Sequence, residues 1–144
     1  MNRAIFSDTV TLYNYIKQGR QDSWTRTVLK GVQIRAGRTE SSDGEGTAQQ
    51  SESLSLTIPF DVDSGGKPYA VPEAFTADSW TLKAQNGMDI VVVGECELIP
   101  GAELSIDELM QQTESYTISS VRDNTHRRYL KHWKVGGVLK WVNL

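Results

Sequence analysis

The sequence predicts a mainly β fold, a small antiparallel β-barrel or sandwich with one short α-helix and one long flexible loop. Three observations lead to this expectation. Short runs rich in β-branched and aromatic residues alternate with polar residues along most of the chain. Turn-forming residues separate these runs, and one segment alone has the start signal of a helix. With 144 residues, 38% of them apolar, the chain has the size of one domain covering residues 1–144.

The first two runs predict a β-hairpin. Residues 9–16 and residues 24–35 alternate in the manner of strands, and residues 17–22 between them are polar. Gly19 in this polar segment can take the positive φ that a tight turn requires. Gly31, inside the second run, indicates a bulge or a bend at which one strand becomes two.

The segment that follows, residues 37–50, has a different composition. It contains no aromatic or large aliphatic residue, so it buries too little apolar surface to offset the entropy lost on ordering. We therefore expect a flexible loop or arm. Two interpretations stay open, a surface insertion that the fold tolerates and an arm that becomes ordered on a partner. The charged residues available to such an arm are Arg38, Glu40, Asp43 and Glu45.

The remaining strand-like runs are residues 53–60, 80–84, 89–95, 116–121, 129–133 and 138–142. In the first of these runs, alternation places Leu54, Leu56 and Ile58 on one face. Pro59 cannot donate to a ladder, so the strand ends there or lies at a sheet edge. A tight turn is expected at residues 85–87.

One helix is expected, at residues 105–112. Ser105 and Glu108, three residues apart, match a capping box. Ile106, Leu109 and Met110 share one face at helical spacing. Because the helix is short, packing of this apolar face must stabilise it.

Composition argues against several classes of function. The formal net charge is −3, so no global positive charge favours nucleic acid. The longest apolar runs are far too short to span a membrane, and the first residues lack the apolar stretch of a signal peptide. We therefore expect a protein made in the cytoplasm that does not act in a membrane.

Residues that could support catalysis are few. The chain contains no phosphate-binding loop, dinucleotide fingerprint or nucleophile elbow. Cys96 is flanked by carboxylates, which disfavour the thiolate that a nucleophile needs, so a structural cysteine is expected. His126 and His132 have the spacing to share a metal on one strand face, but the cations around them would repel it. We expect no enzyme activity, no cofactor and no metal.

The charge pattern is most uneven near the C-terminus. The residues of this basic face are Arg122, Arg127, Arg128, Tyr129, Lys131, Trp133 and Lys134. Cations interleaved with aromatic rings can bind the backbone and bases of a nucleic acid. The same pattern also fits contact with an acidic protein surface, or a solvated strand face with no partner. Nucleic acid is the least favoured of these partners because the chain as a whole is acidic.

Seven short segments, in a defined order and spacing, have the pattern of a known group of proteins. They are VTLYNY at 10–15, WTRTVLKGV at 24–32, LTIP at 56–59, DIVVVG at 89–94, VRDN at 121–124, RYL at 128–130 and VGG at 135–137. Together they resemble small structural proteins encoded in the head–tail modules of tailed phages and prophages. The resemblance implies a virion component near the portal or the tail connection, of the minor capsid, head–tail joining or tail completion type.

The resemblance implies assembly and no catalytic residues. Its expected partners are other virion proteins, namely portal, connector or tail-tube subunits, and further copies of the chain itself. The protein would be made in the host cytoplasm and end in the head–tail region of the virion. The alternative from a different class is a cytoplasmic binding module that contacts nucleic acid or an acidic protein surface through residues 122–134.

Overall fold

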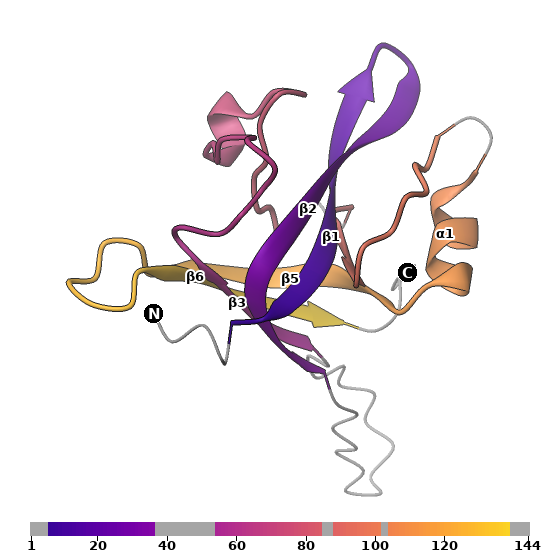
Figure 1. The fold of residues 1–144 in the computed structure, drawn as a ribbon. Coiled ribbons are helices and arrows are strands. Elements are labelled where there is room, and N and C mark those ends of the chain that lie inside the picture. The colour runs from indigo at the N-terminus through magenta and orange to yellow at the C-terminus, as the bar shows by residue number, and fades with distance from the viewer. Residues whose placement is uncertain (1–5, 37–53, 85–87, 102–103, 139–144) are drawn as a thin grey trace, which may run out of the picture.

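Six antiparallel strands form a closed barrel, so the mainly β fold predicted from the sequence is confirmed. The computed structural model describes residues 6–36, 54–84, 88–101 and 104–138 (Figure 1). The strands are β1 (Asp8–Gln18), β2 (Gln21–Ala36), β3 (Leu54–Pro59), β4 (Ile90–Val93), β5 (Ser115–Asp123) and β6 (His132–Val138). Their order around the barrel is β1–β2–β3–β6–β5–β4, and β4 pairs with β1 to close it. A 3₁₀ helix, η1 (Pro72–Ala74), and an α-helix, α1 (Ile106–Gln112), complete the described elements.

The opening hairpin is confirmed in both its turn and its bulge. β1 and β2 pair over their whole shared length, and Gly19 takes a φ of 64° in the turn. A register shift between Asp8 and Thr9 skips Gly31, which has a φ of 92°. Beyond this bulge β2 changes neighbours and pairs with β3 from Gln33 onwards. One continuous strand therefore contributes to two parts of the barrel wall.

The barrel interior is filled by the strand faces that the alternation predicts. Leu54, Leu56 and Ile58 of β3 are buried, and β3 ends at Pro59. The same apolar cluster contains Val10 and Leu12 of β1 and several residues from β2, β4, β5 and β6. Burying these side chains supplies the main stabilisation of the fold.

The strand predicted at residues 80–84 is wrong. These residues form no ladder, and Trp80 makes only an isolated bridge with Tyr69. The side chain of Asn14 replaces a neighbouring strand: its Nδ2 donates to the Thr81 carbonyl at 2.8 Å, and its Oδ1 accepts from the Thr81 N–H at 3.1 Å. The segment is nevertheless buried, and Trp80 and Leu82 join the main core.

The boundaries of the last predicted strands also differ from the sequence expectation. Residues 129–131 belong to an exposed loop, and the strand begins at His132 and continues through Val138. The reason is local, because Leu130 has a φ of 56°, which a strand cannot include. The predictions at residues 37–50, 85–87 and 139–142 lie outside the described residues.

Helix α1 confirms the predicted capping box. The Ser105 Oγ accepts from the Glu108 N–H at 3.1 Å, and the Glu108 Oε1 accepts from the Ser105 N–H at 3.0 Å. Leu109 is buried, and Ile106 and Met110 pack against the same second apolar cluster, which contains Tyr13. Packing therefore holds this short helix, as its length requires. Within the described residues, no helix is long and apolar enough to cross a membrane.

Replacing Ser105 by alanine removes the side-chain acceptor of this cap. We expect the free energy of unfolding to fall by about 1 kcal/mol, because the Glu108 N–H loses its partner at the helix start. Urea unfolding followed by circular dichroism measures the change. Asp107→Asn, two residues away and exposed, is the control, and a loss of equal size there would contradict the capping role.

Candidate functional site

The β5–β6 hairpin extends beyond the barrel and carries most of the basic face predicted from the sequence. Figure 1 shows its loop, residues 124–131, reaching out at the end of the molecule opposite α1. The Asn124 N–H donates to the His132 carbonyl at 2.9 Å, which closes the base of the loop. The hairpin therefore presents a defined loop to solvent.

Three large apolar side chains are exposed at this loop. Tyr129 is 74% exposed, Leu130 is 65% exposed and Phe60 is 55% exposed. Phe60 follows β3, and its N–H donates to the Lys131 carbonyl at 3.0 Å, so it is tied to the hairpin. Exposed apolar side chains gathered in one place mark interaction sites more often than scattered ones do.

Cations lie around these apolar side chains. The Arg128 guanidinium carbon is 6.0 Å from the centre of the Tyr129 ring, and the Lys131 Nζ is 5.8 Å from that of Phe60. Arg127 is also exposed in the same loop. We call the set Phe60, Arg127, Arg128, Tyr129, Leu130 and Lys131 the hairpin tip. Arg128 and Lys131 make cation–π contacts with aromatic rings of the tip itself, and the same kind of contact could form with aromatic rings of a partner.

The conformation of the loop is fixed by local hydrogen bonds. The Asn124 Nδ2 lies 3.2 Å from the His132 Nε2, and the His132 Nδ1 lies 2.5 Å from the Leu130 carbonyl oxygen. The Asp123 carboxylate accepts from the Thr125 N–H at 2.8 Å. Partial desolvation opposes ionisation of Asp123, but the hydrogen bonds from Thr125 outweigh it and lower the pKa of this carboxyl group. The tip is therefore largely preorganised.

Two further cations of the basic face lie behind the tip. Arg122 of β5 and Lys134 of β6 are register partners and are both exposed. Like charges at directly opposed positions disfavour pairing of the strands. The Lys134 Nζ reaches across to the Thr57 Oγ1 at 3.2 Å, which directs it toward β3. The positive charge of the tip thus continues along the outer face of the hairpin.

Trp133 does not belong to the exposed basic face, which corrects the sequence prediction. Its side chain is only 6% exposed and lies in the barrel interior. Its ring centre is 5.3 Å from that of Trp80 and 4.6 Å from that of Tyr69. Alternation along β6 places Trp133 and Val135 inside and Lys134 outside. The period of two was visible in the sequence and would have assigned Trp133 to the core.

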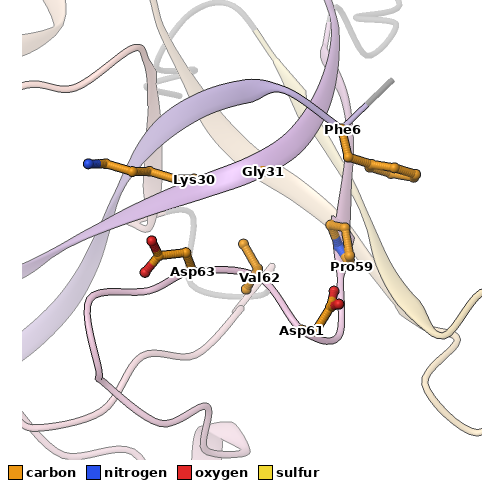
Figure 2. Close-up of a pocket in the computed structure, with 7 residues that line it drawn as sticks. All are labelled: Phe6, Lys30, Gly31, Pro59, Asp61, Val62 and Asp63. Atoms are coloured by element: carbon orange, nitrogen blue, oxygen red, sulfur yellow. The ribbon is translucent and has the colours of Figure 1, made fainter. Parts of the chain in front are cut away.

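A pocket of about 300 Å³ lies beside the segment that supplies Phe60. It is lined by Phe6, Lys30, Gly31, Pro59, Asp61, Val62 and Asp63 (Figure 2). Two backbone hydrogen bonds, from the Lys30 N–H to the Asp63 carbonyl at 2.9 Å and in return at 3.1 Å, fix its wall. Figure 2 shows the charged ends of Lys30 and Asp63 on one side and Phe6 on the other. The pocket has the size to take one side chain of a partner.

The other predicted contact residues cannot be placed. Arg38, Glu40, Asp43 and Glu45 lie outside the described residues. The sequence analysis also missed two members of the tip, Phe60 and Leu130. Phe60 continues the period of Leu54, Leu56 and Ile58, which assigns it to the buried face, and only the end of the strand at Pro59 indicated that this period stops before it. Leu130 had no signal, because its exposure depends on the left-handed backbone at that position.

Comparison with known proteins gives a family and no function. No curated protein and no solved structure matches the chain. The profile of a family of unknown function (DUF6751) matches residues 5–138, which include all six strands of the barrel and the hairpin tip. The chain therefore belongs to this family of unknown function, DUF6751.

Proposed function

We propose that the chain is a structural protein of the head–tail connection of a tailed phage or prophage and acts by protein–protein assembly. The observation that carries the proposal is the hairpin tip, which exposes Tyr129, Leu130 and Phe60 on a fixed loop. Three segments of the sequence resemblance, residues 121–124, 128–130 and 135–137, lie on the β5–β6 hairpin. The remaining segments form the barrel that supports it.

The closed barrel limits how a partner can bind. Each of the six described strands pairs with two others, so the closed part of the barrel offers no free edge to an added strand. The second pairing covers only part of the longest strands, because β1 meets β4 over Val10–Tyr13 and β2 meets β3 over Gln33–Ala36. Around the closed part, contacts come from side chains and loops that extend beyond the sheet. The hairpin tip meets this requirement, because it combines apolar area with a cationic border.

The energy available at the tip suits an assembly of repeated subunits. Full burial of one large apolar side chain contributes about 1.5–3 kcal/mol. Three such side chains, reduced by the cost of association, give a weak contact for a single pair of proteins. In a ring each subunit makes the same contact, and linked contacts strengthen one another. A virion connector is an assembly of this kind.

The direct test is mass spectrometry of particles purified after induction of the source organism. The proposal expects the chain in intact particles at a constant ratio to the portal protein. Its absence from intact particles would contradict a structural role in the virion. Treatment of the particles with nuclease before purification controls for protein carried along by DNA.

The double substitution Tyr129→Ser/Leu130→Ser tests the tip within this assay. We expect incorporation into particles to fall about tenfold or more, because the apolar contact is lost. The free energy of unfolding should change by less than about 1 kcal/mol, since both side chains are exposed. Val71→Ser, an exposed apolar residue beside η1, is the control. Normal incorporation of the double variant would exclude the tip as the contact.

A second candidate function is binding of single-stranded nucleic acid by the same tip. The observation in its favour is the exposed Tyr129 ring with the Arg128 guanidinium next to it, a pair on which a base can stack. The core position of Trp133 removes one of the two aromatic rings that the sequence assigned to this role. Salt-dependent binding of oligonucleotides that is lost in Arg127→Glu/Arg128→Glu would support it. No binding at low ionic strength would exclude it.

A further inference from the structure

A second exposed surface that combines charge with apolar area lies at the end of the molecule opposite the hairpin tip. In the segment after β4, Glu95 and Glu97 are exposed, and Ile99 is 61% exposed with Leu98 beside it. We call residues 95–99 the acidic strap. Figure 1 shows the segment between β4 and α1 on the side of the molecule away from the β5–β6 loop.

Hydrogen bonds to β1 and β2 hold the acidic strap in place. The Thr11 hydroxyl donates to the Gly94 carbonyl at 2.8 Å and accepts from the Cys96 N–H at 2.8 Å. The Tyr13 hydroxyl donates to the Leu98 carbonyl at 2.6 Å. Burial raises the pKa of Tyr13, so its hydroxyl stays protonated and remains a donor at neutral pH. The strap is therefore a preorganised surface.

The first three residues of the strap alternate between outward and inward positions. Cys96 packs against the second apolar cluster, which agrees with the structural role predicted for this cysteine. Glu95 and Glu97 on either side of it face solvent. Arg26 of β2 is a cation close to the strap. Its Nε donates a hydrogen bond to the Cys96 carbonyl, so it is bound to the backbone of the strap. Two exposed acidic residues of α1, Asp107 and Glu108, add negative charge at the same end of the molecule.

We propose that the hairpin tip of one copy docks on the acidic strap of a second copy. Arg127, Arg128 and Lys131 would face Glu95 and Glu97. The apolar pair of the tip, Tyr129 and Leu130, would cover Leu98 and Ile99. The inference rests on the proposed function in one respect, the use of the tip as an assembly surface. It adds the identity of the partner, which is a second copy of the same chain.

Charge complementarity singles out a second copy as the occupant. The two surfaces have opposite charge, and each adds exposed apolar side chains that the other would cover. The two surfaces lie on opposite sides of the molecule, so the tip of one copy cannot contact the strap of the same copy. A contact between unlike surfaces is heterologous, so it leads to a ring if the rotation closes and to a filament if it does not.

The first measurement is sedimentation velocity of the full chain over a range of concentrations at low ionic strength. We expect the average mass to rise with concentration and the association to weaken at about 0.5 M salt, because exposed charges are screened. A single limiting mass would indicate a ring, and a continuing rise would indicate a filament. A chain that stays monomeric at all concentrations would overturn the proposal.

Charge reversal on each surface separates this contact from nonspecific association. Arg127→Glu/Arg128→Glu makes both surfaces acidic, and Glu95→Lys/Glu97→Lys makes both basic. Each variant alone should associate at least about tenfold more weakly than the unchanged chain, because like charges would meet. An equal mixture of the two variants should associate again, since each one then supplies the surface that the other lacks. Failure of the mixture to associate would overturn the proposal.

Matched variants control for the change in net charge. Lys17→Glu/Arg20→Glu reverses two exposed cations on the β1–β2 hairpin, and Glu73→Lys/Asp78→Lys reverses two exposed carboxylates between β3 and β4. Both should associate like the unchanged chain. An effect as large as that of the surface variants would show that net charge alone governs association and would overturn the proposal.

The particle assay keeps the two proposals apart. Incorporation of the chain into particles without any association in solution would defeat the head-to-tail contact and leave the structural role intact. Association that follows the charge-reversal pattern, together with absence from particles, would defeat the virion role and leave the contact intact.

Discussion

Replacing Trp80 by alanine is expected to lower the free energy of unfolding by about 3–5 kcal/mol. Trp80 is the largest fully buried side chain among the described residues, and its ring meets Tyr69 and Trp133 at 5.1 and 5.3 Å. Its backbone also holds the segment between β3 and β4, because its N–H donates to the Pro68 carbonyl at 3.0 Å. Urea unfolding followed by far-ultraviolet circular dichroism measures the loss, since fluorescence would change with the tryptophan itself.

Trp80→Phe is the matched control for this variant. It keeps an aromatic ring in the cluster and should lose less than half as much stability as the alanine variant. If alanine costs less than about 1 kcal/mol, the buried segment does not contribute to the core as the structure indicates.

Asn14→Leu is expected to cost about 2–5 kcal/mol although the two side chains have similar size. Asn14 is completely buried, and its amide is bonded to both the N–H and the carbonyl of Thr81. Its Nδ2 also donates to the Asp89 Oδ2 at 2.8 Å. Leucine would leave the two backbone groups of Thr81 without this partner, and each group buried in that way costs about 1–3 kcal/mol.

The control for this second prediction is Thr27→Val. Thr27 is buried on β2, and among the described residues its hydroxyl has no hydrogen-bond partner. Exchange of that hydroxyl for a methyl group should leave the stability unchanged or raise it, because a buried polar group without a partner is costly. A loss in Asn14→Leu no greater than in Thr27→Val would show that the Asn14 amide does not hold the Thr81 segment.

The strands were predictable where a strand has one buried face. Leu54, Leu56 and Ile58 alternate with polar residues, and the buried side follows directly from that period. Residues 80–84 show the limit of this reasoning, because a segment that is buried and extended has the same pattern whether or not a ladder forms. The amide of Asn14, distant in sequence, replaces the ladder there, and no local pattern shows it.

The candidate site was predictable in its charge and less so in its shape. Arg127, Arg128 and Lys131 were recognised as a basic cluster, and they do lie together in one exposed loop. The aromatic rings that lie beside these cations depend on packing. The Trp133 side chain is buried in the barrel, and Phe60, which follows β3, is hydrogen-bonded to the hairpin. The acidic strap was noticed only as a pair of carboxylates, because its position at the far end from the tip is a property of the closed topology.

The pairing of Ala36 with Leu54 has a consequence for how chains of this kind can vary. The ends of the two strands that flank residues 37–53 are register partners, so the ladder between β2 and β3 already fixes where that connection leaves and returns. The cost of closing a longer connection grows only with the logarithm of its length. Insertions and deletions between Ala36 and Leu54 should therefore change the stability of the barrel only slightly. Differences in length can accumulate in this connection while the barrel and its hairpin tip stay unchanged.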